Sequence, residues 1–161
     1  MLAKSTLTLA VFTWMAASAL AQQVTLPLPR LLTVMPMGGQ AGTTVEVTIT
    51  GENTENISEL MFSTPKITAK PVAGTENKFT VSIAADAPVG VYDARVMSRL
   101  GVSAARAFSV NKLPEVIRTK ANNSVETAMA LPLGTICNAT MTKRSVDFYA
   151  FQGVKGKRVA V

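Results

Sequence analysis

The chain has 161 residues, carries a net charge of +6, and contains no histidine and a single cysteine, Cys137. Without histidine it cannot form the Ser–His or Cys–His pairs that activate many nucleophiles. One cysteine and no histidine also exclude a structural zinc site of the usual kind and a disulfide within the chain. We therefore predict that the protein is not an enzyme and has no catalytic residue, cofactor or metal site. Cys137 is interpreted as a small buried apolar residue, with pairing to another chain as the alternative.

The positive charge is concentrated in the second half of the chain. Residues 112–161 carry eight Lys or Arg against three Asp or Glu, a net charge of +5. Such a surplus forms a solvated basic face, or it attracts nucleic acid, anionic lipid or an acidic envelope polymer. No basic run is interleaved with aromatic residues, as binding to single-stranded nucleic acid would require. We therefore predict no nucleic-acid partner.

Residues 1–21 have the pattern of a secretory signal peptide. Lys4 supplies a positive start, Leu7–Ala17 is a short apolar run, and Ala19-Leu20-Ala21 is a small-x-small cleavage site before Gln22. The alternative is an uncleaved anchor helix, but the apolar run is short for a membrane span, which needs about 20 residues. We predict cleavage, no membrane span after it, and a secreted, periplasmic or cell-envelope location.

After an extended, proline-containing segment at 22–30, seven short strands are predicted, separated by turn signals. Phe79, Val81 and Ile83 alternate with polar residues and should point inward. Pro71 lacks a backbone donor, so its strand should lie at a sheet edge. The predicted strands are Leu31–Met35, Thr43–Thr50, Ser58–Ser63, Ile67–Val72, Lys78–Ala84, Val91–Met97 and Val102–Val110, the last irregular around Ala104–Arg106.

Residues 36–42 form a glycine-rich stretch between the first two predicted strands. Neither a Lys-Ser/Thr pair nor a helical pattern follows it, so it is not a phosphate-binding loop. We interpret it as a strand connector.

The stretch Ala84–Met97 combines a turn with a strand. Asp86 and Pro88 favour a tight turn, and the strand after Gly90 then places Tyr92 on the same face as its alternate apolar residues. A tyrosine at such a strand entry is typical of the tyrosine corner of immunoglobulin-like sandwiches, in which the hydroxyl bonds a backbone group upstream. We therefore predict a central sandwich strand here.

The segments M-P-M-G-G-Q-A-G-T-T-V-E-V-T-I-T-G, E-L-M-F-S and A-A-D-A-P-V-G-V-Y-D-A-R-V together resemble the IPT/TIG-like immunoglobulin-like domains of bacterial envelope proteins. The resemblance covers Leu31–Val110 and implies a β-sandwich domain at 31–111. Such domains serve as spacers, adhesion modules and enzyme appendages, so the resemblance indicates a fold more than a function.

Asn111–Pro114 is typical of a linker, and the chain after it resembles the start of a bacterial pre-peptidase C-terminal domain. The matching motifs are Asn122-Asn123, Glu126-Thr127-Ala128, Asp147-Phe148-Tyr149-x-Phe151 and Lys155-Gly156-Lys157. The resemblance implies an incomplete jelly-roll-type β-sandwich at 112–161. Relatives of this family accompany secreted proteases and other envelope proteins, and some bind calcium or matrix polymers.

Calcium binding is not carried over from that family. Arg118, Lys120 and Ser145 stand where relatives have acidic residues, and Ala121 replaces a proline, whereas calcium requires several carboxylate and carbonyl oxygens. Of the acidic positions at most Glu115 and Asp147 remain, and we interpret both as surface charge.

Residues 157–161, K-R-V-A-V, indicate the beginning of a strand with no partner after it. We expect an open strand edge and an uncovered apolar face that includes Phe148, Tyr149 and Phe151. An edge of this kind pairs readily with another chain. We interpret the sequence as a fragment of a larger multidomain protein.

These patterns predict an all-β protein, with an immunoglobulin-like sandwich followed by a partial jelly-roll-type sandwich. The predicted function is non-enzymatic interaction, adhesion or architecture in the cell envelope. The predicted partner is an envelope or matrix polymer, or another protein that binds at the open strand edge. The alternative is the N-terminal accessory region of a secreted hydrolase whose catalytic domain lies elsewhere.

Overall fold

The computed structural model describes residues 27–141 and 143–160, and the predicted signal peptide at 1–21 lies outside these residues. Strands are the regular elements of the described chain, which confirms the all-β prediction. The described residues include no helix with the length and apolar character needed to cross a membrane. The strands are β1 (Arg30–Met35), β2 (Gly38–Gln40), β3 (Thr44–Glu52), β4 (Glu59–Phe62), β5 (Ile67–Pro71), β6 (Lys78–Ile83), β7 (Gly90–Ser98), β8 (Gly101–Val102), β9 (Arg106–Asn111), β10 (Glu115–Ile117), β11 (Met129–Ala130), β12 (Ile136–Asn138) and β13 (Tyr149–Ala150).

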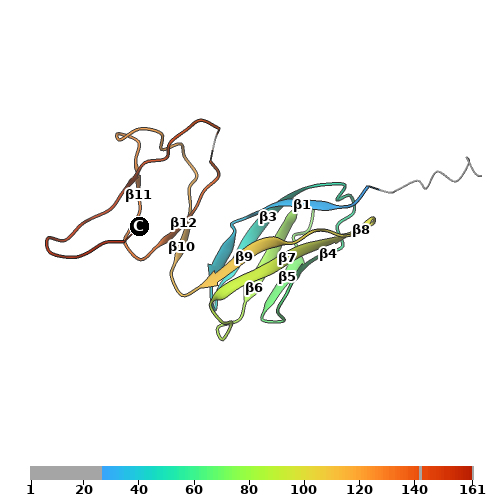
Figure 1. Cartoon of the computed structure of the whole chain (residues 1–161). Coiled ribbons are helices and arrows are strands. Elements are labelled where there is room, and N and C mark those ends of the chain that lie inside the picture. The colour runs from blue at the N-terminus through green and yellow to red at the C-terminus, as the bar shows by residue number, and fades with distance from the viewer. Residues whose placement is uncertain (1–26, 142, 161) are drawn as a thin grey trace, which may run out of the picture.

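Strands β1–β9 form two sheets that pack face to face (Figure 1). One sheet has the order β1-β3-β6-β5 and is antiparallel throughout. The other has the order β2-β9-β7-β4, with β8 paired to β7 and with β2 parallel to β9. β5 lies at a sheet edge, as its Pro71 predicts, and β7 lies between β9 and β4, as expected for a central strand.

The core lies between the two sheets and is built by alternate residues of their strands. In β6 the inward residues Phe79, Val81 and Ile83 are 1%, 0% and 4% exposed, as their alternation predicts. Phe108 of β9 is fully buried, and its ring meets that of Phe62 edge to face, with ring centroids 5.0 Å apart. The buried apolar residues are Leu31, Val34, Val47, Ile49, Leu60, Ile67, Phe79, Val81, Ile83, Ala87, Ala94, Val96, Phe108 and Val110.

The predicted tyrosine corner is present at the start of β7. The Tyr92 hydroxyl donates a hydrogen bond to the carbonyl of Pro88 at 2.7 Å, while the ring packs against the core. The turn before the strand is closed by a bond from the Ala87 amide to the Ala84 carbonyl at 3.0 Å. The bond from Tyr92 therefore holds the turn against the strand that follows it.

We expect Tyr92→Phe to lower the free energy of unfolding of the sandwich by about 0.5–1.5 kcal/mol, because one hydrogen bond is lost while the ring is kept. Urea unfolding followed by circular dichroism would measure this change, with an unaltered slope. Tyr149→Phe, outside the sandwich, is the matched control and should leave the midpoint of the sandwich unchanged. Equal midpoints for the two variants would contradict a stabilising corner.

The prediction for residues 36–42 is wrong in part, because the glycine-rich connector contains the strand β2. Gly38 and Gly39 are buried, and β2 pairs in parallel with β9. A Cβ atom at Gly38 would lie 2.4 Å from the Ser109 carbonyl oxygen, so only glycine allows this approach. The strand escapes sequence analysis because two of its three residues are glycines, which have no side chain to show an alternation.

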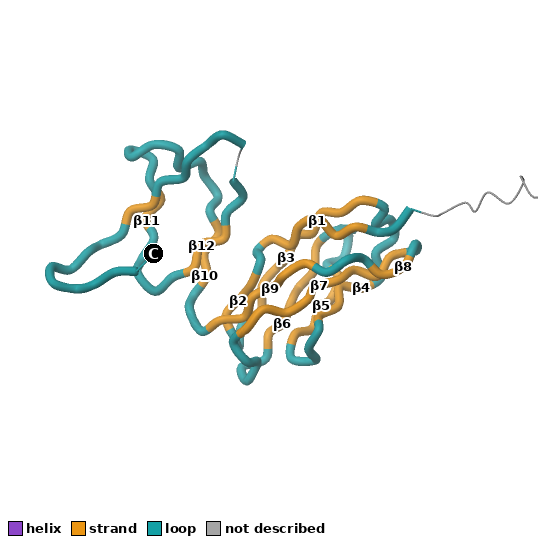
Figure 2. Tube along the Cα trace, viewed as in Figure 1, coloured by secondary structure: helices purple, strands orange, loops and turns teal. Residues whose placement is uncertain are grey.

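Residues 115–141 and 143–160, here called the C-terminal segment, lie beyond the end of the sandwich opposite to the entry of residue 27 (Figures 1 and 2). They form two small parallel sheets, β10-β12 and β11-β13. The strand predicted at the end of the chain is wrong for residues 157–160, which are irregular, and residue 161 lies outside the described residues. None of the described strands pairs with these residues. The jelly-roll connectivity and the domain boundary at 111/112 stay predictions.

Candidate functional site

A polar cluster joins the C-terminal segment to the sandwich. The carboxylate of Glu115 accepts hydrogen bonds from the side-chain amides of Asn111 and Asn138. Asn138, which is 4% exposed, accepts a third bond from the backbone amide of Met37 through its side-chain oxygen at 2.9 Å. Because Met37 and Asn111 belong to the sandwich side, these four residues tie the two parts together. We call them the junction cluster.

Glu115 is therefore not the simple surface charge that the sequence suggested. A cavity of about 430 Å³ adjoins the junction cluster, lined by residues of β2, β3 and β10. The polar groups of the junction cluster already bond one another. The cluster therefore positions the C-terminal segment rather than presenting free groups to a ligand.

A buried ion pair lies at the centre of the C-terminal segment. Arg118 donates to Asp147 at 3.1 Å and to the side-chain oxygen of Asn122 at 2.8 Å, and it also bonds the carbonyl of Thr140. The side chains of Arg118 and Asp147 are 10% and 8% exposed. The interpretation of Asp147 as surface charge is therefore wrong, since Arg118 neutralises it inside the segment.

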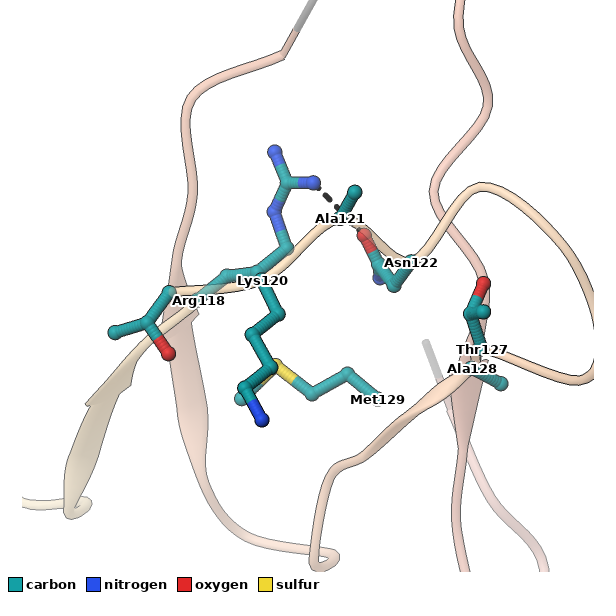
Figure 3. Close-up of a pocket in the computed structure, with 8 residues that line it drawn as sticks. Arg118, Lys120, Ala121, Asn122, Thr127, Ala128 and Met129 are labelled. Carbon is teal, nitrogen blue, oxygen red and sulfur yellow. Dashed lines mark hydrogen bonds between the residues drawn. The ribbon is translucent and has the colours of Figure 1, made fainter.

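Asn122 extends this network to the backbone. Its side-chain nitrogen donates to the carbonyl of Phe148 at 2.8 Å, and the amide of Phe148 donates to the carbonyl of Asn122 at 2.7 Å. A cavity of about 390 Å³ beside the network is lined by Arg118, Lys120, Asn122 and neighbouring residues (Figure 3). The positive charge of Arg118 is thus used to hold three separate stretches of chain together.

The other ion pairs of the described residues lie on the surface of the sandwich. They join Arg30 to Glu52, Lys66 to Asp86, Lys78 to Glu46 and Arg95 to Asp93, and each of their side chains is at least 41% exposed. Pairs of this kind contribute little to stability because water screens them. Lys66, through its hydrogen bond and its charge, lowers the pKa of Asp86.

The positions singled out for calcium do not come together as a metal site. Arg118 is paired with Asp147, Glu115 lies in the junction cluster, and Lys120 is exposed. Among the described residues no group of three or more His, Cys, Asp or Glu could hold a metal ion.

Exposed apolar side chains gather in the C-terminal segment. Leu131, Leu133, Tyr149, Phe151 and Val159 line a cavity of about 360 Å³ together with Pro132, Gly134, Thr135 and Ala160, and we call this cavity the aromatic groove. Tyr149 is 38% and Phe151 is 49% exposed, as the sequence led us to expect, while Phe148 is half-buried. The segment also exposes Ile117, Val125, Met141, Val146 and Val154.

Cys137 is half-buried rather than buried. Its sulfur is 4.0 Å from the hydroxyl of Tyr149 and 4.0 Å from the sulfur of Met129. Burial, and next the hydrogen bond to Cys137, raise the pKa of the Tyr149 hydroxyl. Tyr149 therefore stays neutral over the physiological range and presents an uncharged ring to the groove.

Sequence reasoning missed the parts played by Arg118, Asn138 and Asn111. In the sequence, Arg118 is visible only as an interruption of an acidic pattern. The one available signal was that Arg118 and Asp147 both sit beside motifs shared with the same family, Asn122-Asn123 and Phe148-Tyr149. That proximity did not reveal that the two charges meet.

Comparisons with known proteins give distant structural matches. No protein-family model and no curated protein matches the chain. One similar structure is SGBP-B of the Bacteroides ovatus mixed-linkage glucan utilization locus in complex with a mixed-linkage heptasaccharide, at 18% identity over 68% of this chain and a TM-score of 0.39. Another is the BIgI domain of beta protein from S. agalactiae bound to CEACAM1, at 14% identity over 52% of this chain and 94% of that domain, with a TM-score of 0.31.

The chain spans 27% of the length of the SGBP-B chain. Both TM-scores lie below 0.5, so the fold is assigned from the molecule itself. The sheet order β1-β3-β6-β5 against β9-β7-β4 corresponds to the A-B-E-D and G-F-C sheets of immunoglobulin domains, and Tyr92 supplies the tyrosine corner. Strands β1–β9 are therefore an immunoglobulin-like β-sandwich. The finer resemblances to IPT/TIG-like and pre-peptidase C-terminal domains stay predictions.

Proposed function

We propose that this chain is a non-enzymatic interaction protein of the bacterial cell envelope. In this proposal the sandwich carries the C-terminal segment, and the segment binds an envelope polymer or another protein. The observation that supports it is the aromatic groove, in which two aromatic rings and several aliphatic side chains remain exposed. Concentrated exposed apolar surface of this kind marks interaction sites in soluble proteins.

The junction cluster supports the same proposal. Glu115 and Asn138 hold the C-terminal segment against the sandwich through hydrogen bonds that are partly buried. A binding surface held in this way loses less freedom when it meets its partner than one on a loose tail. The chain also has no histidine, so acyl transfer by the common nucleophile–base pairs is excluded for the chain alone.

Sedimentation with isolated cell envelopes of the source organism tests the proposal. We expect the full chain to pellet with the envelopes and Phe151→Ser to reduce the retained amount roughly tenfold, because an exposed aromatic anchor is lost. Val91→Ser is the matched control, since Val91 is 71% exposed but lies on the sandwich.

Two outcomes would contradict the proposal. In one, the unmodified chain stays in the supernatant. In the other, Phe151→Ser is retained like Val91→Ser while salt releases both steeply, which would assign binding to the basic surface rather than to the aromatic groove.

A further inference from the structure

The edge of β13 away from β11 has no neighbouring strand among the described residues. β11 bonds β13 through the amides of Met129 and Leu131, which donate to the carbonyls of Phe148 and Ala150 at 2.9 and 2.8 Å. A parallel strand directs the backbone groups of alternate residues to opposite sides. The backbone groups of Tyr149 and Phe151 therefore face away from β11, toward the open side.

The aromatic groove shares Tyr149 and Phe151 with this open edge. Tyr149 belongs to β13, Phe151 follows it directly, and both line the groove together with Leu133 and Val159. An extended chain placed along the edge would therefore have backbone partners on one side and an apolar hollow for its alternate side chains. Strand addition of this kind combines affinity from main-chain hydrogen bonds with specificity from side-chain pockets.

The charges of the C-terminal segment restrict what that chain can be. Between residues 127 and 160 the only acidic residue is Asp147, which is buried against Arg118. The basic residues of the same range are all exposed, namely Lys143, Arg144, Lys155, Lys157 and Arg158. A second copy of this edge would bring like charges together, whereas an acidic strand complements them.

We propose that the β13 edge binds an extended strand of another protein in which acidic residues alternate with valine or isoleucine. Its backbone pairs with Tyr149 and Phe151, its apolar side chains fill the aromatic groove, and its carboxylates meet the cations of residues 155–158. The inference rests on the proposed function and specifies the partner of the same surface.

Titration of the isotope-labelled full chain with a nine-residue peptide of alternating glutamate and valine, blocked at both ends, tests this inference by nuclear magnetic resonance. We expect saturable shifts and slower hydrogen exchange at the amides of Tyr149 and Phe151. Phe151→Ala, and separately Lys157→Glu combined with Arg158→Glu, should each weaken binding roughly tenfold. Val91→Ala is the control for an exposed apolar side chain and should change binding less than twofold.

A peptide methylated on alternate backbone nitrogens distinguishes binding by strand addition from binding through side chains or charge alone. It keeps every charge and side chain but cannot pair along an edge, so we expect no binding. Equal binding of the methylated peptide would overturn the inference. So would displacement by a sulfated polysaccharide with no effect of Phe151→Ala, which would indicate a polyanion site. Dimers of the chain that dissociate on Phe151→Ala would show that a second copy occupies the edge, which also overturns the inference.

The two proposals fail separately. If the peptide does not bind but envelope retention still depends on Phe151, the strand inference fails and the proposed function stands. If the peptide binds but the envelopes retain nothing, the proposed function fails.

Discussion

Arg118→Ala should unfold the C-terminal segment and leave the sandwich folded. Removing Arg118 leaves the carboxylate of Asp147, which is 8% exposed, without its cation and also deletes the bonds to Asn122 and Thr140. Breaking one side of a buried ion pair costs about 3–5 kcal/mol. A segment this small has a free energy of unfolding of a few kcal/mol at most. The cost of breaking the ion pair therefore exceeds the stability of the segment.

Hydrogen exchange read at single amides measures this effect. In the variant, amides of residues 115–160 should lose their protection, while those of β3, β6 and β7 keep theirs. Lys120→Ala is the matched control, because Lys120 is an exposed cation two residues away and its loss should change protection by less than about 0.5 kcal/mol. Arg118→Met combined with Asp147→Leu should restore most of the protection, since neither charge then remains buried. Unchanged exchange in Arg118→Ala would show that the ion pair does not hold the segment.

Phe108→Ala should destabilise the sandwich itself. Phe108 is 0% exposed, and its ring fills the space between the sheets and meets Phe62 edge to face at 61°. Truncating a buried phenylalanine costs about 3–5 kcal/mol, because transfer energy is lost and a cavity remains. Urea unfolding followed by far-ultraviolet circular dichroism should show a large fall in the midpoint of the main transition.

The control for Phe108→Ala is Val91→Ala, since Val91 lies in the neighbouring strand β7 but is 71% exposed. We expect it to change the free energy of unfolding by no more than about 0.5 kcal/mol. A loss below about 1 kcal/mol in Phe108→Ala would contradict a well-packed core at this position. Together with Arg118→Ala, this variant also tests the predicted domain boundary at 111/112. Two separable transitions would support the boundary, and a single shared transition would argue against it.

The sandwich was predictable because its strands alternate clearly. Phe79, Val81 and Ile83 lie in the core as their period of two requires, and Pro71 places β5 at an edge because it cannot donate to a neighbour. Tyr92 was predictable as well, since its partner Pro88 is only four residues away. In each case the physical cause acts locally along the chain.

The C-terminal segment was less predictable because few of its residues alternate. Its strands have two or three residues each, too few to show a period. The strand expected after residue 156 is absent from residues 157–160, since a strand requires a neighbour to bond. The sequence does not reveal β2 for a related reason. Two of its three residues are glycines, which have no side chain to show an alternation.

The sequence by itself determined the all-β class, the positions of the main strands along the chain, the inward faces of the sandwich and the surplus of basic charge. Only the tertiary structure decided which polar groups meet. Arg118 and Asp147 are 29 residues apart, and Met37 and Asn138 are 101 residues apart. The physical reason is that hydrophobic alternation acts between near neighbours, whereas the burial of a charge or an amide depends on a partner that folding brings from elsewhere. The sequence predicted an uncovered apolar face with Tyr149 and Phe151, but it placed the open strand edge at residues 157–161, where no strand forms. The open edge of β13 follows from the pairing of β13 with β11 in the tertiary structure.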